Sequence, residues 1–272
     1  MEAITAHSAY YDDLVLALQI ADEVDAFTMR RFMASDLHVE TKPDLSPVTD
    51  ADREAENIAR RILHQERPYD AIVGEEHGRT GHRARTWIID PIDGTKNFVR
   101  GVPVWATLIA LSENERIVLG VVSAPALSRR WFAAENMGAY CGERIGQARA
   151  ISVSGVQHIA DASLSYSSLD GWEPRNQLPA FIELCRQCWR TRGFGDFWSY
   201  MLVAEGVCDI ATEPKLELHD MAALVPIVTE AGGRFTSLSG IDGAGGPGAL
   251  ATNGILHEAA RAILNTPTQS PE

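Results

Sequence analysis

Hydrophobic and polar residues follow a helical period in two segments near the start of the chain. Between residues 10 and 33, apolar residues such as Leu14 and Leu18 recur every three or four positions, with acidic residues between them. A second segment of this kind begins near Thr49, and Thr49 and Asp52 have the spacing of a capping box. The pattern predicts two amphipathic helices, the second starting at about Thr49.

The pattern then changes to short apolar runs that are typical of β-strands. These runs lie at 71–74, 86–90, 106–112, 116–125 and 130–135, and turn residues separate them. Helices followed by a run of strands favour an α+β layer, with the first helices covering an antiparallel sheet. We therefore expect an N-terminal α+β domain over residues 1–148.

From about Ile151 onward, strand-like and helical patterns alternate. Strands are expected near 162–167, 191–195 and 208–213, and helices near 178–190, 197–206 and 221–233. The glycine-rich segment 239–249 is expected to form an exposed loop. This order predicts a smaller α/β domain over residues 149–272.

Composition and charge argue against some classes of binding partner. The net charge is -13 and no Lys/Arg stripe is present, which argues against a nucleic-acid backbone or an anionic membrane surface. No apolar run approaches membrane-spanning length, and Cys185 and Cys188 lie in a helical pattern rather than in a redox turn. A small molecule is the expected partner and the cytoplasm the expected location.

The string WIIDPIDGTKNF (87–98) places two carboxylates at the end of an apolar run. Pro91 prevents simple continuation of the strand, so the side chains of Asp90 and Asp93 can converge. Clustered buried carboxylates repel one another unless a cation lies between them, and oxygen ligands select a hard ion such as Mg²⁺, or Mn²⁺ as a substitute. An acidic turn that only caps a helix would produce a similar string, with Asp93 as its cap.

The next two residues, Gly94 and Thr95, are suited to binding a phosphate group. Gly94 allows close approach of the backbone to a ligand, and free amides at a turn or helix start, such as those of Gly94 and Thr95, bind phosphate oxygens. Glu75 and Glu76 also follow an apolar strand, and Asp220 begins a helix. Three element ends that carry acids suit a phosphatase with more than one metal ion.

Five strings together resemble the inositol monophosphatase superfamily of Mg²⁺-dependent, lithium-sensitive phosphatases. They are SPVTDAD (46–52), GEE (74–76), WIIDPIDGTKNF (87–98), HDMAAL (219–224) and EAGG (230–233). The resemblance implies an αβαβα layered sandwich, a homodimer and hydrolysis of a phosphomonoester by metal-activated water. A family member that has lost turnover and acts as a metal-dependent regulatory protein is an alternative, although the catalytic set is complete.

The resemblance also implies a set of metal ligands for two or three Mg²⁺ ions per active site. Glu75, Asp90 and the carbonyl of Ile92 would hold the first ion. Asp90, Asp93 and Asp220 would hold the second, with Asp93 also next to the phosphate. These ligands come from three separate motifs.

Further roles follow from the same resemblance. Glu75 and Thr95 would orient the attacking water, and the amides of Gly94 and Thr95 would receive the phosphate. Asp50 would support a third ion through water, and Lys42 would be a mobile loop lysine near the phosphate. A merely solvated lysine is the alternative for Lys42.

The leaving alcohol must be recognised elsewhere. The string GDFWSYMLVAEG (195–206) resembles the histidinol-phosphate phosphatases of the superfamily, and Asp196 and Glu213 would attract a cationic substrate group. Asp196 could instead cap the helix that follows it. His219 stands where family members commonly have tryptophan, so its role as a substrate contact or a structural residue stays open. The expected substrate is L-histidinol phosphate; inositol 1-phosphate or a broad range of sugar phosphates is the alternative.

Overall fold

The computed structural model describes residues 9–43 and 45–266, and its larger sheet has eight strands. Their order across the sheet is β10-β9-β8-β7-β6-β5-β3-β4. The bounds are β3 Ala71–Gly74, β4 Gly78–Thr80, β5 Arg85–Asp93, β6 Ala106–Glu113, β7 Arg116–Ala124, β8 Arg129–Ala134, β9 Gly138–Cys141 and β10 Arg149–Ile151. Neighbouring strands are antiparallel except for β3 and β5, which are parallel.

The smaller sheet has five strands in the order β12-β11-β13-β15-β14. The bounds are β11 Ser163–Ser165, β12 Arg190–Arg192, β13 Ile210–Glu213, β14 Arg234–Thr236 and β15 Ala249–Thr252. β11 runs parallel to both β12 and β13, whereas β15 is antiparallel to β13 and β14. The sheet is therefore mixed.

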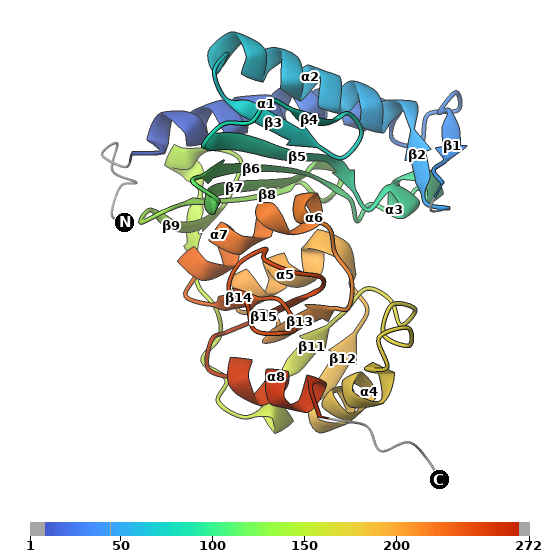
Figure 1. The fold of residues 1–272 in the computed structure, drawn as a ribbon, viewed down its shortest axis with the longest axis vertical. Helices are drawn as coiled ribbons and strands as arrows, with labels where there is room; N and C mark the ends of the chain where they lie inside the picture. Colours follow the sequence, from blue (N-terminus) through green and yellow to red (C-terminus); the bar gives the residue numbers. More distant parts are fainter. Residues whose placement is uncertain (1–8, 44, 267–272) are drawn as a thin grey trace.

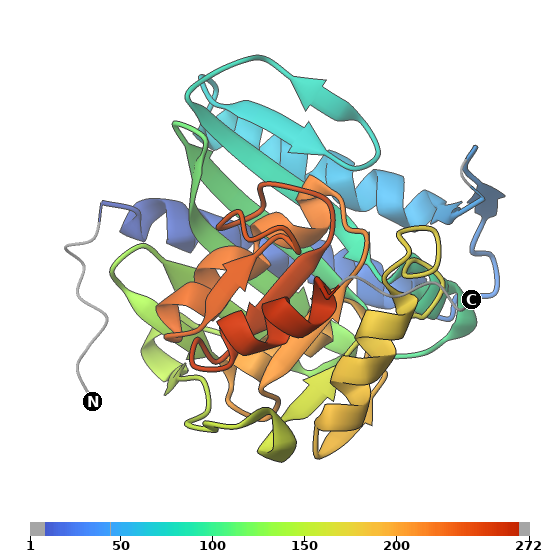
Figure 2. The same ribbon diagram turned by 60° about the horizontal axis from the view of Figure 1, so that its bottom comes forward.

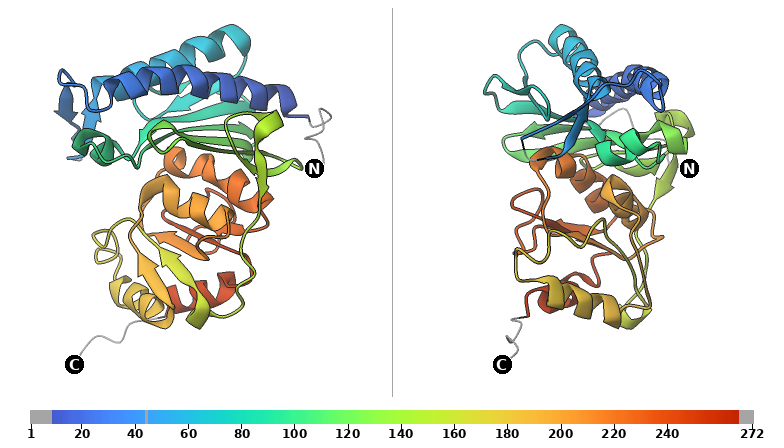
Figure 3. Two further views of the ribbon diagram at one scale, coloured as in Figure 1. Left: turned by 180° about the vertical axis from the view of Figure 1, so that it is seen from behind. Right: turned by 90° about the vertical axis from the view of Figure 1, so that its right-hand side faces the viewer.

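Helices separate and cover the two sheets (Figure 1). The bounds are α1 Tyr11–Arg31, α2 Asp50–Glu66, α3 Thr95–Arg100, α4 Leu178–Gln187, α5 Asp196–Ala204, α6 Leu218–Ala222, α7 Leu224–Glu230 and α8 His257–Leu264. α1 and α2 cover the outer face of the larger sheet, and α5, α6 and α7 lie between the sheets (Figures 1 and 3). α4 and α8 cover the outer face of the smaller sheet (Figure 2). The layers confirm the predicted αβαβα sandwich.

The start of α2 has the predicted capping box. The Thr49 side chain accepts hydrogen bonds from the amides of Ala51 and Asp52, and the Asp52 carboxylate accepts one from the Thr49 amide at 2.8 Å. Small buried residues such as Ala55 and Ala59 let the helix pack closely on the sheet beside α1. A short hairpin, β1 Val39–Thr41 and β2 Pro47–Thr49, leads into it.

The middle layer, formed by α5, α6 and α7, is apolar on more than one side because these helices pack against both sheets. Buried residues of α5 and α7, including Met201 and Ile227, share one core cluster with residues of both sheets. Gly120 of β7 permits the closest approach: a Cβ there would lie 2.2 Å from the carbonyl oxygen of Ala223. Any side chain at Gly120 would therefore push α6 and α7 away from the larger sheet.

Two sequence predictions were wrong in detail. The helix expected at 221–233 is interrupted, because Pro226 has no amide to donate to the carbonyl of Ala222, where α6 ends. The larger sheet is not wholly antiparallel, because the short strand β4 returns along one edge of β3 before β5 pairs with the other edge. Further elements that were not predicted are the strands β1, β2, β4, β9, β10, β14 and β15 and the helix α8.

The division into domains at residue 148 stays a prediction. β10 pairs with β9, so the larger sheet continues to Ile151. None of the helices within residues 9–43 and 45–266 is both long and apolar enough to cross a membrane.

Candidate active site

The two aspartates at the end of β5 are brought to one face of the sheet by a β-bulge. Asp90 is in register with Leu108 of β6 and Asp93 with Ala106, so three steps along β5 match two steps along β6. In a regular strand, residues three apart point to opposite faces. The extra residue in the bulge brings Asp93 back to the face of Asp90. Both carboxylates therefore point toward the helices between the two sheets.

Two groups of potential metal ligands meet at Asp90. Oxygen atoms of Asp90, Asp93 and Asp220 lie within 4.8 Å of one another, and so do ligand atoms of Glu75, Asp90 and His219. Glu75 follows β3, and Asp220 lies in the first turn of α6. Since both groups contain Asp90, its carboxylate can bridge two neighbouring ion positions.

A bound cation would stabilise these clustered carboxylates in their charged form. Burial raises the pKa of Asp90 well above its usual value, and the charges of Glu75 and Asp93 raise it further. Burial and the charge of Asp196 do the same for the pKa of Asp93, and burial raises the pKa of Asp220. A divalent ion would remove this repulsion, and ligands of one Mg²⁺ ion lie at most about 4.2 Å apart, close to the spacing found here. The residues therefore fit a metal ion.

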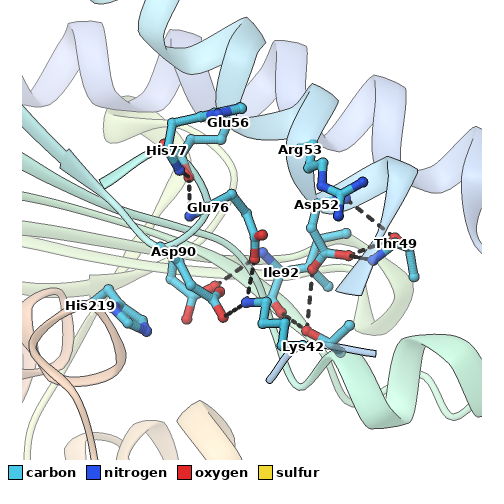
Figure 4. A network of polar contacts seen from close by, with 12 residues as sticks. Lys42, Thr49, Asp52, Arg53, Glu56, Glu76, His77, Asp90, Ile92 and His219 are labelled. Atoms are coloured by element: carbon cyan, nitrogen blue, oxygen red, sulfur yellow. Dashed lines mark hydrogen bonds and ion pairs between the residues drawn. The ribbon is translucent and has the colours of Figure 1, made fainter. Parts of the chain in front are cut away.

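Lys42 reaches the same carboxylates from the loop between β1 and β2. Its ammonium lies 2.7 Å from Oε1 of Glu75 and 2.6 Å from Oε1 of Glu76 (Figure 4). Burial lowers the pKa of Lys42, but hydrogen bonds from the ammonium to Glu75 and Glu76 outweigh it and raise the pKa overall. Lys42 is therefore an ion-pair partner of a predicted metal ligand rather than a solvated lysine.

The loop that carries Glu75 and Glu76 is fixed by Glu56 of α2. The Glu56 carboxylate accepts hydrogen bonds from the amides of Glu76, at 2.7 Å, and His77 (Figure 4). A Cβ at Gly74 would lie 1.9 Å from the same carboxylate, so the loop can approach α2 only with glycine there. The position of Glu75 thus depends on α2.

Thr95 is held by two acceptors at the start of α3. Its hydroxyl lies 3.2 Å from Oδ1 of Asp52 and 3.0 Å from the carbonyl oxygen of Ile92. Gly94 precedes it with φ 84°, a left-handed conformation that suits glycine. Gly94 and Thr95 both line a cavity of about 460 Å³ together with Glu75 and Asp93. The acidic-turn alternative is wrong in one respect: Gly94, not Asp93, is the N-cap of α3.

Asp52 is the residue at this site that sequence reasoning missed. It was seen only as a helix cap, yet its fully buried carboxylate contacts both Thr49 and Thr95. Burial raises its pKa to about 6. Its position in the SPVTDAD string was the available signal.

Asp50 lies outside both ligand groups of the described residues. Its carboxylate pairs with Arg31 at 2.8 Å and accepts a hydrogen bond from the His38 amide. Residues two apart on a helix point to different sides, so Asp50 turns away when Asp52 faces the site. The structure gives the third-ion role of Asp50 no support.

Two further acids, Asp196 and Glu213, line the same cavity. Asp196 accepts a hydrogen bond from the Asn97 side chain at 3.0 Å, and its own amide donates to the Ser167 hydroxyl. Burial raises the pKa of Asp196 to about 6. Burial and the charge of Asp196 raise the pKa of Glu213 to about 8, against the lowering effect of the Ser167 hydroxyl.

The alternative role of Asp196 as a helix cap is wrong. Gly195 is the N-cap of α5, no side-chain hydrogen bond caps it, and Asp196 itself has a φ of 49°. The aromatic residues beside it serve packing: Phe197 contacts Trp131, and Tyr200 contacts Phe235. The Asp196 carboxylate is thus directed to the cavity side of α5.

Comparisons with known proteins place the chain in a family. The profile of the Inositol monophosphatase family matches residues 13–269. The chain belongs to this family. It is therefore a phosphoric monoester hydrolase that depends on a metal ion, as the sequence resemblance implied.

Individual members of the inositol monophosphatase family are similar over nearly the whole chain. The histidinol-phosphatases of Streptomyces coelicolor and Mycobacterium tuberculosis are each 54% identical, covering 94% of this chain and 98% of their own lengths. A solved inositol monophosphatase from Zymomonas mobilis is 34% identical, with a TM-score of 0.84, 96% of this chain covered and 100% of that one. The Thermotoga maritima IMPase is 30% identical, with a TM-score of 0.83, 93% of this chain covered and 97% of that one.

Proposed function

We propose that this member of the inositol monophosphatase family hydrolyses L-histidinol phosphate to L-histidinol and inorganic phosphate with Mg²⁺. The observation that carries the proposal is the acidic wall formed by Asp196 and Glu213, which lines the same cavity as the metal-ligand residues Glu75, Asp93 and Asp220. A substrate with an anionic phosphate at one end and an ammonium at the other matches this division of charge. The names of the two relatives at 54% identity support the same substrate.

The metal ligands follow from the two groups that share Asp90. Asp90, Asp93 and Asp220 would hold one ion, and Glu75 and Asp90 the other. The Ile92 carbonyl, which the family resemblance adds to Glu75 and Asp90, accepts a hydrogen bond from the Thr95 hydroxyl. Bound Mg²⁺, or Mn²⁺ in its place, would supply positive charge to the phosphate and make a water molecule more acidic. The ligand positions explain how a chain with a net charge of -13 can accept an anion.

The remaining residues position the water and the phosphate. The Thr95 hydroxyl can donate its single hydrogen to Asp52 or to the Ile92 carbonyl, which leaves its oxygen to accept a hydrogen bond from the attacking water, and Glu75 lines the same cavity. The amides of Gly94 and Thr95 would bind phosphate oxygens. Lys42 would contact the phosphate when it leaves Glu75.

The test is a substrate panel on the purified protein with Mg²⁺. We expect kcat/KM for L-histidinol phosphate to exceed that for inositol 1-phosphate by at least about 100-fold, because the inositol ester has no cationic group for the acidic wall. A preference for the inositol ester would replace this proposal with a polyol phosphatase. No phosphate release from any small monoester would favour a regulatory protein.

The proposal includes a homodimer that acts in the cytoplasm. The dimer rests on the family resemblance, and the location suits a small water-soluble substrate. Light scattering of the purified protein and fractionation of cells test these two points.

A further inference from the structure

His219 lies where a ring nitrogen can share an ion with two carboxylates. One of its ring nitrogens is within 4.8 Å of oxygen atoms of both Glu75 and Asp90, which are themselves within this distance of each other. Figure 4 shows the imidazole next to Asp90. The three residues come from different parts of the fold, namely the ends of β3 and β5 and the first turn of α6.

The first turn of α6 fixes this arrangement. The Asp220 carboxylate accepts a hydrogen bond from the Glu217 amide at 2.7 Å, and the two residues form a reciprocal capping box. Consecutive residues on a helix are about 100° apart, so His219 and Asp220 reach different sides of Asp90. Asp220 faces the Asp93 side, and His219 faces the Glu75 side.

The contact between His219 and its neighbour does not by itself explain the ring position. Nε2 of His219 is 3.5 Å from Oδ1 of Asp220, longer than an ordinary hydrogen bond. The side chain is only 21% exposed, so the ring is held inside the site rather than in solvent. Two ligands of one ion lie at most about 4.4 Å apart when each bond is about 2.2 Å, so movements of a few tenths of an ångström suffice.

We propose that His219 is a direct ligand of the metal ion that Glu75 and Asp90 hold, and that this position prefers Mn²⁺ to Mg²⁺. The inference rests on the metal site of the proposed function. Imidazole suits transition metals better than Mg²⁺, whereas the group of Asp90, Asp93 and Asp220 offers only oxygen. The two ion positions therefore differ in chemistry, one with nitrogen and oxygen ligands and one with oxygen ligands alone.

The test is pulsed electron paramagnetic resonance of the whole protein with one equivalent of Mn²⁺ and no substrate. We expect a nitrogen coupling to Mn²⁺ in the wild type, and we expect labelling the histidines with ¹⁵N to change its pattern. The labelling arm uses no variant, so it does not depend on the folding of a mutant. Mn²⁺ bound without nitrogen coupling would overturn the inference and leave the proposed function intact.

Variants assign the coupling to one histidine. His219→Phe should abolish it and weaken Mn²⁺ binding by about tenfold or more, with a smaller effect on Mg²⁺. His77→Gln is the matched control, since His77 is exposed beside Glu76, and it should keep the coupling.

Coupling that persists in His219→Phe would overturn the inference. Failure of the protein to bind Mn²⁺ at all would overturn both the inference and the proposed metal site, whereas coupling in a protein that does not hydrolyse histidinol phosphate would leave the inference standing.

Discussion

The hydroxyl of Thr95 lies 3.2 Å from Oδ1 of Asp52, although the two residues are 43 positions apart in the chain. The contact joins the cap of α2 to the start of α3, and it fixes the direction of the hydroxyl next to the proposed water. Asp52 thus has two tasks, since its other oxygen accepts hydrogen bonds from Thr49. Four predictions follow from this contact and from three other parts of the structure.

Asp52→Asn and Thr95→Ala should each lower kcat for L-histidinol phosphate by about 100-fold or more, with little change in KM. Because the two residues act as one unit, the double variant should lose little beyond the worse single variant. Steady-state kinetics of the three proteins tests this. Losses in kcat that multiply in the double variant would show that the residues act independently.

Asp93→Asn should lower kcat by about 100-fold or more, because it removes a charged ligand without changing side-chain size. Without metal the variant should melt at a higher temperature than the wild type, because a buried like charge beside Asp90 is gone. Thermal melts with chelator and with added Mg²⁺ measure both states, and added Mg²⁺ should raise Tm less in the variant. Asp242→Asn, a change on the exposed surface, is the control. Wild-type turnover in Asp93→Asn would remove Asp93 from the metal site.

Asp196→Asn should lower kcat/KM for L-histidinol phosphate by about 10- to 100-fold, which is the value of a hydrogen bond to a charged group. Asparagine tolerates the positive φ of 49° and still offers an acceptor to Asn97, so the backbone should be unchanged. Inositol 1-phosphate hydrolysis should change by less than about threefold. Equal losses for the two esters would show that Asp196 supports the site without recognising the cation.

The contribution of His257 to stability should fall as pH decreases from about 6.5 to 4, whereas buried acids with a raised pKa, such as Asp52 and Asp196, act in the opposite direction. The fully buried ring of His257 contacts the hydroxyls of Thr236 and Thr252, and burial lowers its pKa from 6.5 to about 4. In this window His257 binds a proton in the unfolded chain but not in the folded chain, so its contribution to the free energy of unfolding rises with pH up to about 6.5. Urea unfolding at pH 5 and pH 7 tests this. The free energy of unfolding at pH 7 minus that at pH 5 should be less positive in His257→Gln than in the wild type, and an unchanged value would exclude a contribution from His257.

Much of the site could be predicted from local strings because each string places its acids at the end of a strand or helix. The residues Glu75, Asp90, Asp93 and Asp220 were named in this way. What the string could not reveal is the bulge, since its register depends on pairing with β6. Pro91 correctly indicated a break in regular geometry but not its direction.

The sequence could not decide between two roles where one residue type suits both. Asp50 and Asp52 are both acids near the start of α2, and only the packing of the helix determines which one faces the site. The contact of Asp196 with Asn97 spans 99 positions, so no local pattern could distinguish it from a helix cap. His219 was likewise undecided, because its neighbours come from β3 and β5.

Because of the bulge in β5, the number of residues between Asp90 and Asp93 determines where Asp93 points. Ile88 faces the helix layer between the sheets, and Ile89 faces α1 and α2. The extra residue in the bulge makes Asp93 face the same side as Ile88. Loss of one residue would turn Asp93 toward α1 and α2, away from Asp90 and Asp220. Under the proposed function, point changes in α5 and β13 would alter substrate choice, whereas an insertion or deletion at the end of β5 would misdirect a proposed metal ligand.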